Sequence, residues 1–159
     1  MQKITPFLWF DHQAEEAVGF YTSIFKNSKV DAVTRYGESG PGPKGSVMTI
    51  AFELDGQKFT ALNGGPYFKF TEAVSFVVNR GSQQEVDEMW VKLSACGQEV
   101  QCGWLKDKYG LSWQIVPAAF LEMVTDQDAE RKERVMKAMM KMKKLDLAAL
   151  EAAYEGKRS

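Results

Sequence analysis

The hydrophobic positions of the first 120 residues follow strand-like and then helix-like spacing, and this order occurs twice. Residues 4–10 form a short, aromatic-rich apolar run that is typical of a buried strand, and residues 14–25 have the apolar spacing of a helix on a core. At an offset of 69 positions, Phe76 falls on Phe7 and Trp90 on Tyr21. The match is one of pattern, and it predicts a strand-helix-strand-strand-strand module that is used twice.

Turn signals divide the remaining strands. Asp55-Gly56 predicts a hairpin between strands at residues 46–54 and 57–62, after a strand at 29–36. Residues 37–45 are so rich in glycine and proline that they predict a loop, either a plain connection or a mobile lid. Residues 99–104 are expected to supply a further strand of the second module.

A second hairpin is predicted within residues 102–117, with its turn at residues 107–110. In its second strand, alternation places Trp113 on one face and Ser112 and Gln114 on the other. Buried polar groups need hydrogen-bond partners or a ligand, so these two side chains are either satisfied core groups or part of a binding site.

Cap residues mark the expected helices. Asp11 is the candidate N-cap of the first, and Ser82 and Glu85 form a capping box for the second. After Pro117 the sequence predicts helices at residues 118–124 and 128–144, then a last helix that begins after Asp146 and ends at Gly156. The middle one is rich in methionine and lysine, which favours packing against the domain or a second subunit over membrane-surface or calmodulin-target behaviour.

Composition limits the function classes. The 159 residues have a net charge of -1, which gives no general attraction to nucleic acid or acidic lipid. No apolar run is long enough to span a membrane, and no signal peptide is visible, so a cytoplasmic protein is expected. Cys96 and Cys102 are the only cysteines and have no metal-finger spacing.

Three segments resemble the PhnB-like group of the vicinal oxygen chelate superfamily: ITPFLWFDHQAEEAVGFYTSIF, NGGPYFKFTEAVSFVV and CGWLKDKYGLSWQIVP. That superfamily includes glyoxalase I, extradiol dioxygenases and bleomycin- and fosfomycin-resistance proteins. The resemblance implies an α+β fold in which two βαβββ modules, residues 1–66 and 67–120, form an open, cupped eight-stranded mixed sheet. Residues 121–159 would be a C-terminal helical extension, and a homodimer is expected.

The resemblance also implies where a metal would bind. Metal enzymes of the superfamily take His or Glu ligands from the first and fourth strand of each module. Those positions fall here at or beside Thr5, within residues 58–63, at residues 73–74 and on Gln114, none of which is a good ligand for a divalent ion. We therefore predict no metal site and no cofactor. Such proteins are also described as 3-demethylubiquinone methyltransferase-like, but the sequence has no glycine-rich strand-to-helix turn with a downstream acid.

The expected site is a cavity for a small organic ligand, lined by aromatic side chains and a few polar ones. The candidate lining residues are Thr5, Phe7, Trp9, Asn63, Cys102, Tyr109, Ser112 and Gln114. His12 and Cys102 are minor candidates for catalysis, and whether any reaction occurs stays open. Two alternatives remain: a metal-dependent glyoxalase- or dioxygenase-type enzyme that recruits Glu53, Glu72 or Asp107, and a dimeric interaction module without a reaction.

Overall fold

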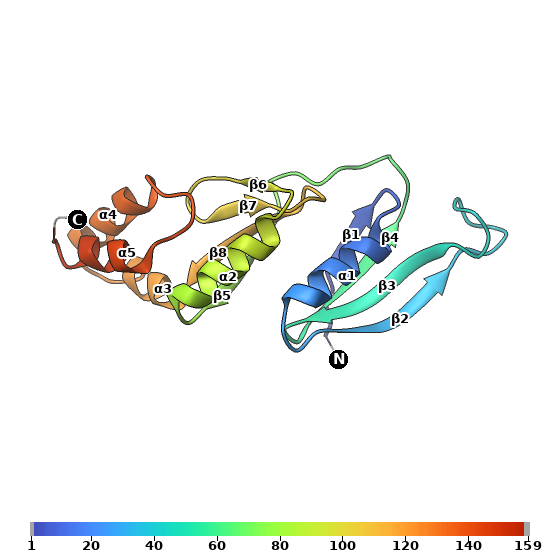
Figure 1. The fold of residues 1–159 in the computed structure, drawn as a ribbon, viewed down its shortest axis with the longest axis horizontal. Helices are drawn as coiled ribbons and strands as arrows, with labels where there is room; N and C mark the ends of the chain where they lie inside the picture. The colour runs from blue at the N-terminus through green and yellow to red at the C-terminus, as the bar shows by residue number, and fades with distance from the viewer. Residues whose placement is uncertain (1, 158–159) are drawn as a thin grey trace. The chain divides into compact units, whose positions relative to one another are not determined.

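The structure is a computed structural model that describes residues 2–157, and it divides into two compact units, one ending at Phe70 and one beginning at Thr71. Each unit contains a βαβββ module, and the second also carries the C-terminal helices (Figure 1). The predicted α+β class, with two such modules and C-terminal helices, is confirmed. Each module has a four-stranded mixed sheet of its own.

The first module has one helix on one face of its sheet (Figure 1). Its elements are β1 (Phe7–Phe10), α1 (Ala14–Ile24), β2 (Lys29–Arg35), β3 (Val47–Leu54) and β4 (Gln57–Asn63). The strand order is β1-β4-β3-β2, in which β1 runs parallel to β4 and the other pairs are antiparallel. The predicted hairpin joins β3 to β4, with positive φ at both Asp55 and Gly56, as a type I′ hairpin turn requires.

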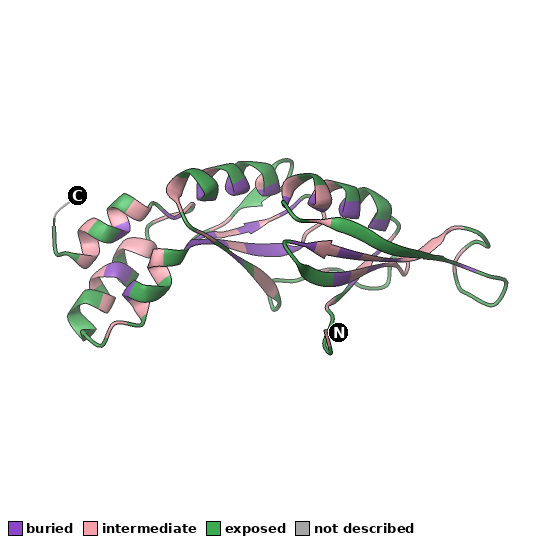
Figure 2. Ribbon diagram, turned by 90° about the horizontal axis from the view of Figure 1, so that it is seen from below, coloured by how far each residue is buried: buried purple, intermediate pink, exposed green. Residues whose placement is uncertain are grey.

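The core of the first module lies between α1 and one side of the sheet. Val18 and Tyr21 of α1 are buried, as are Leu8, Phe10 and Phe52 of the strands. Because side chains alternate along β1, Phe7 and Trp9 point to the opposite, open face. Figure 2 shows this division as buried positions on the inner sides of the helices and exposed positions on their outer sides.

The second module repeats the arrangement. Its elements are β5 (Ser75–Arg80), α2 (Gln83–Ser94), β6 (Gln98–Glu99), β7 (Trp104–Lys106) and β8 (Ser112–Pro117). The strand order is β5-β8-β7-β6, with β5 parallel to β8, and the predicted hairpin within residues 102–117 joins β7 to β8. β6 is shorter than the strand expected at residues 99–104 and begins at Gln98.

The caps are partly as predicted. Ser82 Oγ accepts from the Glu85 amide at 3.2 Å, but the Glu85 carboxylate accepts from the Ser82 hydroxyl instead of the Ser82 amide. The prediction for Asp11 is wrong, because α1 begins after Gln13 and no side chain of its own turn caps it. Asn63 at the end of β4 supplies the cap instead, since its Oδ1 accepts from the Ala14 amide at 2.8 Å.

The C-terminal extension, residues 118–157, consists of α3 (Ala118–Val124), α4 (Ala129–Met139) and α5 (Leu147–Tyr154). Its core joins Val116 of β8 to Met123, Val135, Leu145 and Leu150. Asp146 caps α5 as predicted, and Gly156 follows its end with positive φ. None of the helices within residues 2–157 is long and apolar enough to cross a lipid bilayer.

The helix predicted at residues 128–144 ends five residues early, at Met139. The segment after it makes hydrogen bonds to the second module: the carbonyl of Met142 accepts from the Cys102 amide at 2.8 Å, and that of Lys143 from the Gly103 amide at 2.7 Å. Before it, the amides of Lys141 and Met142 donate to the carbonyls of Ala138 and Met139, three residues back, so the chain is wound more tightly than an α-helix. The segment then leaves the helical path and bonds to the second module, which helical spacing alone does not predict.

Candidate small-molecule site

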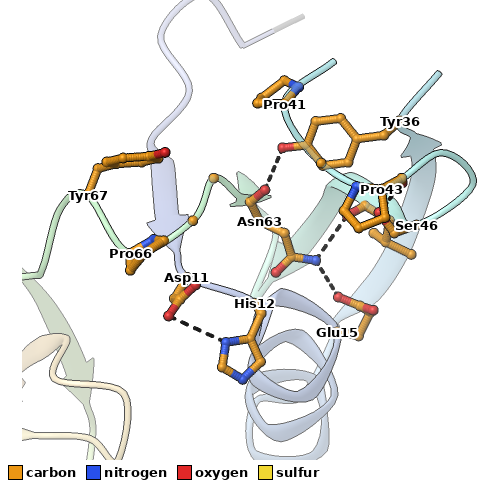
Figure 3. A pocket seen from close by; sticks show the side chains of 14 residues that line it. Asp11, His12, Glu15, Tyr36, Pro41, Pro43, Ser46, Asn63, Pro66 and Tyr67 are labelled. Atoms are coloured by element: carbon orange, nitrogen blue, oxygen red, sulfur yellow. Dashed lines mark hydrogen bonds and ion pairs between the residues drawn. The ribbon is translucent and has the colours of Figure 1, made fainter. Parts of the chain in front are cut away.

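A pocket of about 420 Å³ lies in the first module, between the Gly-Pro loop after β2 and the segment that follows β4 (Figure 3). The start of α1 forms its third side. The lining residues are Asp11, His12, Glu15, Tyr36, Pro41, Gly42, Pro43, Ser46, Val47, Asn63, Gly64, Gly65, Pro66 and Tyr67. The loop at residues 37–45 thus forms one wall of the pocket.

Asn63 holds the three sides of the pocket together. Its side-chain oxygen caps α1, and its Nδ2 donates to Glu15 Oε1 at 2.5 Å and to the Val47 carbonyl at 3.0 Å. Its own carbonyl accepts from the Tyr36 hydroxyl at 2.5 Å (Figure 3). The side-chain amide of Asn63 therefore has all its hydrogen-bonding groups satisfied within the protein. Asn63 lines the pocket and also stabilises its walls.

Two close approaches shape the walls. A side-chain Cβ at Gly64 would overlap the ring of Trp9, and one at Gly42 would overlap the ring of Tyr36. Trp9 also donates from Nε1 to the Gly65 carbonyl at 2.9 Å, so its ring lies directly behind the Gly64 wall. Glycine is needed here for space, because the backbone lies against aromatic rings.

The charged side chains of the pocket are acidic. Asp11 and Glu15 are its carboxylates, and none of the described lining residues is Lys or Arg. His12 Nδ1 lies 3.5 Å from Asp11 Oδ2, and the imidazole is 78% exposed, so it lies at the mouth. Proline and tyrosine side chains complete the walls, which gives the pocket both polar and apolar surfaces.

The other predicted residues of the first module lie beside this pocket. Trp9 is half-buried and packs edge-on against Phe68, with ring centroids 4.9 Å apart. Phe7 is 59% exposed on the open face, and Thr5 is exposed just before β1. The structure therefore brings Trp9 and Asn63 to one place and leaves Thr5 and Phe7 outside the pocket wall.

The predicted residues of the second module are spread over β8 and the turns around β7. Gln114 Nε2 donates to Ser75 Oγ at 2.9 Å across the β5–β8 pair. Ser112 is fully buried, and its Oγ has no hydrogen-bond partner within residues 2–157. Cys102 Sγ lies 3.8 Å from Met140 Sδ, and the Tyr109 amide donates to Asp107 Oδ1 at 2.9 Å. The predicted cavity takes residues from both modules and stays a prediction.

The strands that carry metal ligands in the superfamily do not offer a suitable donor set. β1, β4, β5 and β8 contain no His, Cys, Asp or Glu. Divalent ions in proteins ordinarily bind carboxylate, imidazole or thiolate groups. Within residues 2–157, no three His, Cys, Asp or Glu side chains come close enough to hold a metal ion. The residues present at these positions do not fit the metal that the fold implies.

The three carboxylates considered as alternative metal ligands already have partners. Glu53 lies 3.4 Å from Lys29 Nζ, and Glu72 pairs with Lys106, whose hydrogen bond lowers the pKa of that carboxyl. Asp107 is buried and accepts three hydrogen bonds, from the amides of Tyr109 and Leu111 and from Trp113 Nε1. Each therefore stabilises its local structure.

The paired βαβββ modules define a protein of the vicinal oxygen chelate fold. Among solved structures, the fosfomycin-resistance protein FosX from Listeria monocytogenes is 14% identical with a TM-score of 0.58, covering 79% of this chain and 98% of its own. A protein from Pseudomonas aeruginosa is 20% identical with a TM-score of 0.61, covering 74% and 98%. These two likenesses show the fold.

The family follows from two closer matches. The model of the 3-demethylubiquinone-9 3-methyltransferase family matches residues 2–116. A PhnB protein from Bacillus cereus, whose description names the same methyltransferase, is 40% identical with a TM-score of 0.67, covering 74% of this chain and 100% of its own. The chain belongs to this PhnB-like family. A search among curated proteins found no match.

Sequence reasoning missed the part that Tyr36 and residues 41–43 play in the pocket. The signal was present, because a tyrosine at a strand end precedes a loop with glycine at every second or third position. The sequence predicts only a connection or a lid for this loop, whereas in the structure Gly40 and Gly42 lie against the Tyr36 ring and the neighbouring prolines line the same pocket.

Proposed function

We propose that the chain is a small-molecule-binding protein of the vicinal oxygen chelate fold, whose ligand occupies the first-module pocket without a metal. The observation that carries the proposal is the pocket itself. Its volume of about 420 Å³ lies within the range of ligand sites, roughly 300–1,000 Å³. The Asn63 network fixes its three sides in advance, which lowers the entropic cost of binding.

The lining favours an organic ligand with a cationic or hydrogen-bond-donating group and a planar or apolar body. Asp11 and Glu15 are acceptors, and no cationic side chain lines the described wall to repel a positive charge. Tyr67 and the prolines offer apolar contact, on which a flat ring can rest. An aromatic amine combines both features and is the ligand class we propose.

The family description names a methyltransferase, but we do not propose methyl transfer for this chain. A nucleotide-type methyl donor is commonly held at a glycine-rich turn between a strand and a helix. Within the two modules, such turns are Asp11-His12-Gln13, without glycine, and Gly81-Ser82, with one, and β8 runs directly into α3. Neither offers the row of backbone amides that such a donor needs.

The test is a fluorescence titration of the protein with aromatic amines, starting with phenethylamine. Because Trp9 lies behind the pocket wall, binding should change tryptophan emission, and a Trp9→Phe variant should lose that change. Glu15→Gln should weaken binding by roughly two- to fivefold, as expected for one exposed ion pair. Glu122→Gln, on the exposed side of α3, is the matched control and should bind normally.

Two results would contradict the proposal. If no aromatic amine changes the emission, or if Glu122→Gln weakens binding as much as Glu15→Gln, the pocket is not the site. Elemental analysis of the purified protein tests the metal-free part separately. One stoichiometric metal ion per chain would favour the metal-dependent glyoxalase- or dioxygenase-type alternative.

We also propose that the chain forms a homodimer. Apolar side chains on and beside the strands are exposed in the single chain, including Phe7 at 59%, Val74 at 63% and Val77 at 49%. Exposed apolar groups of this kind commonly mark interfaces. Light scattering coupled to size-exclusion chromatography should give twice the 17.9 kDa chain mass, and a monomer mass would refute the proposal.

A further inference from the structure

The C-terminal extension contains a second pocket, of about 410 Å³, between α4 and α5. Four of its lining residues are basic: Arg134, Lys137, Lys141 and Lys157. None of the described residues that line it is acidic. The pocket lies outside residues 2–116, the part of the chain that the family model matches.

Helical spacing and small side chains build this pocket. Arg134 and Lys137 lie on one side of α4, and Lys141 continues that side into the following turn. Opposite them, α5 presents Ala149 and Ala153, one turn apart. Because alanine fills little space, the basic side chains face a hollow instead of a packed helix.

Arg134 is fixed at the edge of the pocket. Its Nε donates to the Ala153 carbonyl at 2.9 Å and its Nη2 to the Tyr154 carbonyl at 2.8 Å. These bonds satisfy carbonyls at the end of α5 and use two of the three guanidinium nitrogens. Lys157 lies 2.7 Å from Glu155, whose carboxylate lowers the net charge at that side of the pocket. Lys137 and Lys141 are exposed and supply the remaining positive charge.

We infer that this pocket binds a small organic anion, a phosphate monoester with a short apolar group. Arginine and lysine donors suit phosphate oxygens, and like charges gathered without an acid in the lining repel one another until an anion binds. Met142 and the alanines provide an apolar surface beside the charges. The volume of about 410 Å³ fits a small solute, and this inference is independent of the function proposed for the first module.

The test follows the methionine methyl groups of the full-length protein by NMR during titration with phenyl phosphate. Met142 lines the pocket, whereas Met89 is buried in α2, lines neither pocket and serves as an internal reference. The Met142 signal should shift and saturate below about 20 mM, as a dissociation constant of about 1 mM requires. Added salt should weaken binding. Benzylamine, which has the ring but a positive charge, should leave the signal in place.

Matched double variants assign the effect to the pocket. Lys137→Gln combined with Lys141→Gln should weaken phenyl phosphate binding by at least roughly threefold, the combined effect of two exposed ion pairs. Lys26→Gln combined with Lys143→Gln removes the same charge outside the pocket lining and should bind as the wild type does. The remaining methionine signals report whether each variant is folded. Equal weakening in both variants, or no saturable Met142 shift in the wild type, would overturn the inference.

Discussion

The turn of the second hairpin is built on a buried carboxylate, and its replacement should be costly. Asp107 is only 3% exposed. Its Oδ1 accepts from the amides of Tyr109 at 2.9 Å and Leu111 at 3.1 Å, and its Oδ2 accepts from Trp113 Nε1 at 2.9 Å. The carboxylate therefore joins the turn to the first buried ring of β8.

Asp107→Asn keeps the shape and replaces one oxygen by an NH₂ group. If the amide oxygen stays with the two backbone donors, the NH₂ faces the Trp113 Nε1–H, and two donors oppose each other. The lost bond leaves a buried donor unsatisfied, and the other two bonds lose their ionic strengthening. Together these effects should lower the free energy of unfolding by about 2–4 kcal/mol. The melting temperature should fall by roughly 5–15 °C for a chain of this length.

Thermal and urea unfolding, followed by circular dichroism, measure the cost. Asp31→Asn, at an exposed position of β2, is the control and should change stability by less than about 0.5 kcal/mol. A double-mutant cycle with Trp113→Phe isolates the indole bond, because phenylalanine has no Nε1–H donor. Asp107→Asn should cost about 1 kcal/mol less in that background. An equal cost in both backgrounds would refute the argument that Asp107 acts through Trp113.

Three further changes test other parts of the structure. Gly64→Ala should cost about 1–3 kcal/mol and shift tryptophan emission, since its Cβ overlaps the Trp9 ring; unchanged emission would contradict that packing. The hydrogen bond from Lys144 lowers the pKa of Asp87, so this carboxylate stabilises the fold above its ordinary pKa of 3.8 and loses that effect as the pH falls below it. In the Asp87→Asn variant, the free energy of unfolding should therefore fall less steeply as the pH is lowered through this range. An unchanged pH dependence would argue against the ion pair. Ser112→Ala should leave stability unchanged or raise it by up to about 1 kcal/mol, because it removes a buried hydroxyl without a partner; a clear loss would mean that the hydroxyl is satisfied.

Local signals in the sequence predicted most of the fold. The hairpin at Asp55-Gly56, the cap at Ser82 and the end of α5 at Gly156 all depend on residues that lie next to each other along the chain. The periodicity of residues 14–25 likewise predicted which face of α1 is buried. Such features follow from the sequence because their physical causes act within one turn or one strand pair.

The pocket could not be predicted in the same way. Asn63 and Ala14 are far apart in sequence, and so are Tyr36 and Asn63, yet their hydrogen bonds hold the pocket together. Asp11 looked like the cap of α1 because capping rules consider nearby residues. The helix start is instead capped from β4, which the sheet topology places beside it. Only the folded chain provides the distance between these groups.

Tertiary contacts also explain why the C-terminal extension belongs to the second module. The Gln83 side chain donates to the Leu145 carbonyl at 3.0 Å and accepts from the Leu147 amide at 2.6 Å, so α2 helps to hold the start of α5. The carbonyls of Met142 and Lys143 bind the chain just before β7, and Leu145 contributes to the buried cluster that contains Val116. The basic pocket is therefore held on a framework fixed to β7 and β8. The backbone positions that carry its basic side chains are thus fixed relative to one another, which a recognition site for a small anion requires.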